Sequence, residues 1–139
     1  MNRAELQRLA RLRIREAKVL LDNGCYEGAY YLAGYAVECA LKACIAKQTR
    51  RYDFPDKNAA NKSHSHDLEL LNKVAGLEKD FEIEMKANPA FGTKWGDVKD
   101  WSEESRYQAG APDAAKAGML YDSIVNSKNG VLPWLKKRW

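Results

Sequence analysis

Two short motifs in this sequence combine residue types that could take part in chemistry on nucleotides. In Arg106-Tyr107, the guanidinium group could hold a phosphate through two parallel hydrogen bonds. The Tyr107 ring could stack on a base, or its hydroxyl could accept a transferred nucleotide. A structural role is the alternative: Arg106 would pair with Glu103 or Glu104, and Tyr107 would pack in the core.

The second motif is His66-Asp67. Imidazole is the side chain best suited to proton transfer near neutral pH, so His66 is a candidate general acid. Asp67 falls at the start of an expected helix, where its negative charge suits the helix dipole. Neighbouring residues on a helix do not face each other, so we do not expect Asp67 to orient His66.

A charged pair, Glu38 and Lys42, interrupts the otherwise apolar segment 29–46. The spacing of four residues places the two side chains together on one helical face. The pair is either a structural ion pair or part of a cleft in which Glu38 faces a ligand or a second copy of the chain. Charges in mid-helix are costly in lipid, so we expect no membrane span and no membrane partner. A helix that is apolar on nearly every side is instead expected at the centre of a helical bundle.

A basic stripe on the first helix is the fourth candidate. Spacings of three, four and three residues put its members on one face: Arg8, Arg11, Arg15 and Lys18. Such a stripe is typical of a nucleic-acid surface, but a solvated helix face has the same pattern. The net charge of +4 and the pI near 8.9 permit nucleic-acid binding without requiring it.

The elements that must position these residues all read as helices. Apolar periodicity predicts helices over 2–22 and 25–49, joined as an antiparallel hairpin at Asn23-Gly24. A polar loop is expected over 50–65, and Ser65 is expected to cap a third helix that ends near Gly76.

The C-terminal half is predicted less completely. Residues 78–93 fit either a strand or a helix, and Asn88-Pro89 should break the chain. Residues 95–106 resemble a loop with a short helix. Pro112 is expected to start the last long helix, with Gly130 ending it before a short tail over 130–139. The prediction is a single all-α domain over 1–139.

The cysteine and histidine content argues against metal and disulfide chemistry. Three cysteines, at positions 25, 39 and 44, and two histidines have no spacing typical of zinc ligands. We therefore expect free thiols, no metal, no cofactor and a cytoplasmic location. The N-terminus has no apolar core of the kind that signal peptides carry, so none is expected.

Taken together, several of these motifs resemble the HEPN family, the higher eukaryotes and prokaryotes nucleotide-binding domains. The resemblance covers roughly residues 3–128 and rests on the block from Gly24 to Ala43, on His66-Asp67-Leu68, on Trp101 and on Arg106-Tyr107. It implies a four- to five-helix up-and-down bundle that usually dimerises. Many members pair with a minimal nucleotidyltransferase, and many act in toxin–antitoxin or defence systems.

The resemblance also implies a test for catalysis. Active toxins of the family are metal-independent ribonucleases whose site is an arginine, four to six residues, then a histidine. Where the motif would place its histidine after Arg106, this sequence has Ala111, Pro112 and Asp113. Both histidines of the chain lie upstream of Arg106. Arginine alone is a poor proton shuttle, so the resemblance favours a member without catalytic activity.

The function expected from the sequence is therefore a nucleotide- or RNA-associated domain that dimerises and partners a nucleotidyltransferase. Its cleft would contain Arg106, Tyr107, Glu38 and Lys42, with His66 as a further candidate, and its tyrosines 30, 31 and 35 would lie at the dimer interface. One alternative is a ribonuclease toxin with a rearranged site that uses Arg106 with His66 or His64. Another is an interaction scaffold without a nucleotide role.

Overall fold

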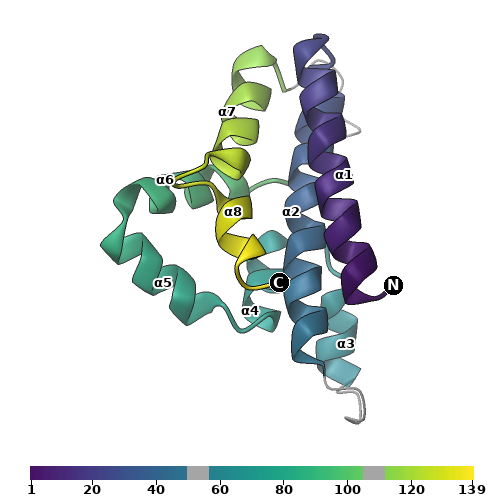
Figure 1. The fold of residues 1–139 in the computed structure, drawn as a ribbon, viewed down its shortest axis with the longest axis vertical. Coiled ribbons are helices and arrows are strands. Elements are labelled where there is room, and N and C mark those ends of the chain that lie inside the picture. The colour runs from purple at the N-terminus through teal and green to yellow at the C-terminus, as the bar shows by residue number, and fades with distance from the viewer. Residues whose placement is uncertain (50–56, 105–111) are drawn as a thin grey trace.

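The computed structural model describes residues 1–49, 57–104 and 112–139, and all long regular elements in these ranges are α-helices. The longest two form an antiparallel hairpin, α1 (Arg3–Asp22) and α2 (Tyr26–Gln48), which lie side by side in Figure 1. A capping box starts α1: the Asn2 side chain accepts from the Glu5 amide, and the Glu5 carboxylate accepts from the Asn2 amide. Gly24 turns the chain with φ 76°, a left-handed conformation that glycine adopts without strain. The predicted hairpin is confirmed.

Two of the four middle helices occupy segments that were not predicted as helix. They are α3 (Lys57–Ser63), α4 (Leu68–Val74), α5 (Glu78–Ala87) and α6 (Pro89–Lys99). The prediction of an uninterrupted loop over 50–65 is wrong where α3 lies; Ala59 and Ala60 are strong helix formers that the polar composition concealed. The ambiguous segment 78–93 is helical, and it breaks at Asn88-Pro89 as predicted.

The prediction of a loop with a short helix after Trp95 is wrong as far as Lys99, because α6 continues to that residue. Phe91, Trp95 and Val98 are buried at spacings of four and three residues, so one face of α6 packs on the core. The pattern was hard to detect because two glycines interrupt the segment.

The C-terminal part contains α7 (Ala114–Val125) and α8 (Val131–Lys136). Pro112 does not start α7; Asp113 is its N-cap and accepts from the Lys116 amide at 2.9 Å. The helix ends at Val125, so the predicted end at Gly130 is also wrong. Gly130 instead precedes α8, which buries four of the residues that were expected to form a tail.

The core surrounds α2. This helix packs against α1, α4, α7 and α8, and its buried residues fall on every side of it. A second part of the core is aromatic: Phe81 lies 4.6 Å from Trp95 and 4.4 Å from Trp134, measured between ring centroids. In Figure 1, α5 and α6 lie beyond α7 and α8 as seen from α1. The all-α bundle predicted from the sequence is confirmed. None of the helices described is long and apolar enough to span a bilayer.

Candidate functional site

Four charged or titratable side chains from three parts of the chain form one series of polar contacts, which we call the Glu38 cluster. Lys42 Nζ lies 3.1 Å from Glu38 Oε2, and His66 Nδ1 lies 2.9 Å from Glu38 Oε1. On the other side of the imidazole ring, His66 Nε2 lies 3.3 Å from Glu103 Oε2. The structure thus brings together Glu38, Lys42 and His66, all three predicted as site residues, and adds Glu103.

Glu38 is the buried centre of this cluster. Its side chain is 2% exposed, whereas those of Lys42 and His66 are 21% and 46% exposed. A buried carboxylate is tolerated when both oxygens have partners, and here each oxygen has one. Both partners of Glu38 are partly exposed to solvent, so the cluster extends from the buried face of α2 to the surface of the protein.

His66 sits in the turn that leads into α4, and its orientation comes from α2. Asp67 is the N-cap of α4, with Oδ1 accepting from the amides of Glu69 at 3.0 Å and Leu70 at 3.2 Å. The expectation that Asp67 does not orient His66 is confirmed. The expectation that Ser65 caps the helix is wrong, since the Ser65 hydroxyl accepts from the Asp67 amide instead, at 3.0 Å.

A close contact between Gly34 and Trp101 holds Glu103 near His66. The Trp101 indole is 3% exposed, and its Nε1 donates to the Tyr30 carbonyl at 3.2 Å. A Cβ at Gly34 would overlap the indole ring, so the ring can lie on α2 only because residue 34 has no side chain. Trp101 therefore fixes the start of the segment that carries Glu103.

The tyrosines of α2 are engaged within the chain. Tyr30 is buried, and the Tyr31 ring stacks on those of Tyr35 and Trp101, each at 6.1 Å between centroids. Burial raises the pKa of the Tyr30 and Tyr35 hydroxyls above their ordinary value. The structure therefore gives these rings a packing role in a single copy, whatever a second copy adds.

The hollow beside His66 is acidic. It has a volume of about 540 Å³, and the described titratable residues that line it are Asp67, Glu69, Asp100, Glu103, Glu104, Lys99 and His66 itself. Lys99 lies 3.7 Å from the Glu69 carboxylate, so its charge is partly neutralised. Among the described residues, five carboxylates face one lysine here, a balance that disfavours an approaching phosphate.

A second hollow, of about 430 Å³, lies on the other side of the Glu38 cluster. It is lined by residues of α1, α2 and α3, among them Glu38 and Lys42, and by His64, which follows α3. His64 is exposed and faces this hollow, whereas His66 lines the acidic one. The two candidate histidines therefore line different hollows.

The predicted basic stripe forms an exposed face on α1. Arg8, Arg11, Arg15 and Lys18 are all exposed. The Arg11 guanidinium carbon lies 4.7 Å from the Trp139 ring centroid, and Lys18 Nζ lies 2.8 Å from Asp22 Oδ1. Hydrogen bonding to Asp22 raises the pKa of Lys18. Within the described residues, no carboxylate pairs with Arg8, Arg11 or Arg15.

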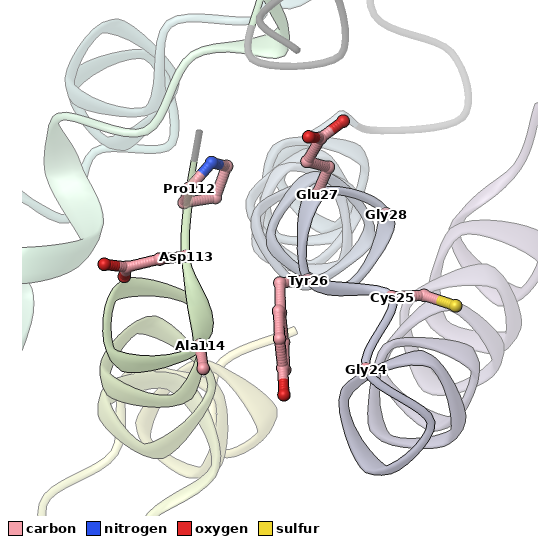
Figure 2. Close-up of a pocket in the computed structure, with 8 residues that line it drawn as sticks. All are labelled: Gly24, Cys25, Tyr26, Glu27, Gly28, Pro112, Asp113 and Ala114. Carbon is pink, nitrogen blue, oxygen red and sulfur yellow. The ribbon is translucent and has the colours of Figure 1, made fainter. Parts of the chain in front are cut away.

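Figure 2 shows a further hollow, of about 580 Å³, between the start of α2 and the start of α7. Its polar side chains diverge: Glu27 and Asp113 point away from each other, and the Cys25 sulfur points away from α7. Because the polar side chains drawn there do not converge, we assign no chemistry to this hollow.

The remaining predictions concern Arg106, Tyr107 and metals. Arg106 and Tyr107 lie outside the residues that the structure describes. No group of three His, Cys, Asp or Glu side chains in the described ranges could hold a metal ion. In the Glu38 cluster the carboxylates of Glu38 and Glu103 contact opposite nitrogens of the imidazole, so they do not converge on one point.

Sequence reasoning missed three features of these surfaces. Glu103 was considered only as a partner of Arg106, and its contact with His66 joins segments that no local pattern relates. The close approach of Trp101 to Gly34 left a detectable signal, a glycine in the middle of a helix. Trp139 was not considered at all as a neighbour of the basic face.

Fold and site define an all-α domain with a buried carboxylate that contacts an exposed imidazole, and with a separate basic helix face. The family model for the HEPN domain matches residues 4–123. The chain therefore belongs to the HEPN family, as the resemblance implied. Comparison with curated proteins and with solved structures gave no match.

Proposed function

We propose that this HEPN domain binds single-stranded RNA or nucleotides through the basic face of α1, without cleaving them. The observation that carries the proposal is the row of four exposed cations, three of which have no carboxylate partner among the described residues. Phosphate neutralisation supplies most of the affinity in non-specific nucleic-acid binding. The Arg11 guanidinium lies over the Trp139 ring, which adds an aromatic side chain to this surface. Lys136 of α8, which is also exposed, adds a further cation. Membership of the HEPN family supports the same ligand class.

The test is oligonucleotide binding by the triple variant Arg8→Gln/Arg11→Gln/Arg15→Gln. We expect affinity for a labelled single-stranded RNA to fall at least about tenfold near 0.1 M salt. The slope of log affinity against log salt should fall by about 2, because each lost phosphate contact removes about 0.7. A matched control removes three exposed lysines from other helices: Lys73, Lys79 and Lys86. Equal losses in both variants would refute a specific face.

Arg106 and Tyr107 remain predicted ligand-binding residues. Arg106→Ala should weaken nucleotide or RNA binding if the arginine holds a phosphate. A variant that binds both ligands unchanged would favour the alternative of an interaction scaffold without a nucleotide role. The binding assay for the basic face can include this variant directly.

We also propose that the domain dimerises and partners a nucleotidyltransferase, in a toxin–antitoxin or defence setting. The support is the family resemblance, and three free cysteines suit a reducing cytoplasm. Light scattering on the purified chain tests the dimer. Co-expression with a nucleotidyltransferase encoded beside it tests the partnership, and separate elution of the two proteins would contradict it.

A metal-independent ribonuclease is the second candidate, and one specific observation favours it. The Glu38 carboxylate holds His66 Nδ1 at 2.9 Å, the arrangement that orients an imidazole for proton transfer. Metal-free incubation with mixed RNAs, run beside His66→Ala and Arg106→Ala, tests this function. Cleavage that His66→Ala abolishes would support it, whereas cleavage that survives would exclude His66 as the proton-transfer group.

A further inference from the structure

A groove between α1, α7 and α8 combines an apolar floor with a basic rim. It has a volume of about 310 Å³. Its apolar lining comprises Ile14, Val19, Tyr121, Val125, Leu132 and Pro133. Each charged residue that lines it is basic: Arg15, Lys18 and Lys136. The oligonucleotide surface proposed above explains the rim but gives the floor no role.

The floor includes an apolar side chain that the fold itself does not bury. Val19 is 57% exposed, one of four large apolar residues in the described ranges with more than half of the side chain in solvent. Ile14, Tyr121 and Val125 are half-buried around it. Together they form a small apolar surface with a basic rim, the arrangement that a docked amphipathic segment requires.

The basic residues of the rim favour an occupant that carries negative charge. Neither Arg15 nor Lys136 has a carboxylate partner among the described residues, and both are exposed. Lys18 is held by Asp22 at 2.8 Å and lies 5.8 Å from the Tyr121 ring centroid. Two unpaired cations around an apolar floor complement a segment that carries apolar side chains flanked by carboxylates. Such a volume holds a few side chains, the scale of helix-in-groove recognition.

We propose that this groove docks an acidic, amphipathic segment of a protein partner. Nucleic acid suits the site less well, because phosphates gain nothing from the apolar floor and Tyr121 is the one lining ring on which a base could stack. The inference does not depend on the proposed RNA binding. It does share Arg15 and Lys18 with the basic face, so the segment and an RNA strand would exclude each other.

A displayed library of random peptides, selected on the full-length chain, tests the proposal. We expect the enriched peptides to place Asp or Glu beside Leu, Phe or Met, and their binding to weaken as salt is raised. Failure to enrich any sequence, or enrichment of basic peptides, would overturn the proposal. The selected peptide then serves as the labelled probe for the variants.

Uncharged substitutions in the floor separate this proposal from RNA binding. Val19→Ser/Val125→Thr should reduce peptide affinity about tenfold, because apolar contacts are lost, and leave oligonucleotide affinity unchanged, because no charge is altered. Ile83→Ser is the matched control, since Ile83 is 65% exposed on α5, which does not line the groove. Peptide binding that tolerates the floor variant would overturn the proposal. So would a floor variant that weakens the oligonucleotide instead, since the groove would then belong to nucleic acid.

Discussion

For Gly34→Ala, helix propensity and tertiary packing predict opposite changes in the stability of the fold. Alanine is favoured over glycine in the interior of a helix by about 1 kcal/mol, so α2 alone would be stabilised. The structure predicts the reverse, because the new Cβ would overlap the Trp101 indole. Trp101 is 3% exposed and cannot move without leaving its site.

The expected cost follows from the contacts that must change. Overpacking a well-packed site costs about 1–3 kcal/mol, and losing the Trp101 hydrogen bond to Tyr30 adds about 1 kcal/mol. Subtracting the gain in helix propensity leaves a net destabilisation of about 1–3 kcal/mol. Displacement of Trp101 would also move the segment that carries Glu103 away from His66.

Urea denaturation followed by far-ultraviolet circular dichroism measures this change. Gly118→Ala is the matched control, since Gly118 lies within α7 and a Cβ there would meet nothing within 4 Å. It should stabilise by up to about 1 kcal/mol. In a Trp101→Ala background, Gly34→Ala should become stabilising, because the overlapping ring is gone. Stabilisation by Gly34→Ala in the native background would refute the proposed contact.

Three further predictions concern a buried charge, a helix cap and the thiols. Glu38→Gln should destabilise the fold by about 1–2 kcal/mol in urea denaturation, less than the 3–5 kcal/mol typical of a broken fully buried pair, because its partners reach solvent; an unchanged midpoint would contradict this. Asp67→Ala should cost about 1 kcal/mol, whereas Asp67→Asn should cost only a few tenths because Asn caps equally well; equal losses would exclude the cap. Burial raises the pKa of the Cys39 and Cys44 thiols to about 11, so at about pH 8 a thiol reagent should label Cys25 in the native protein and the other two only after unfolding. Between pH 9.0 and about 11 the folded thiols keep protons that the unfolded chain releases, so the free energy of unfolding falls as pH rises through this range. Below pH 9.0 the contribution of the thiols to stability is complete. Substituting both buried thiols by alanine should reduce this pH dependence of stability.

The sequence predicted those features whose causes are local. The α1–α2 hairpin follows from apolar periodicity and Gly24, and the Glu38–Lys42 pair follows from helical spacing. The pairing of Glu38 with His66 was not predictable in this way, because 28 residues separate them and their contact depends on how α4 packs on α2. The helix α6 was missed for a similar reason, since tertiary burial overrides the weak helix propensity of its glycines.

The distribution of the described cations favours one of the two proposed functions on physical grounds. Phosphate chemistry needs positive charge beside the group that transfers the proton. Around His66 the described cations are already engaged, Lys42 by Glu38 at 3.1 Å and Lys99 by Glu69 at 3.7 Å. Unpaired cations gather instead on α1, where no imidazole lies. The described side chains therefore favour holding a nucleic-acid strand on α1 over cutting one at His66, unless a further cation reaches the acidic hollow.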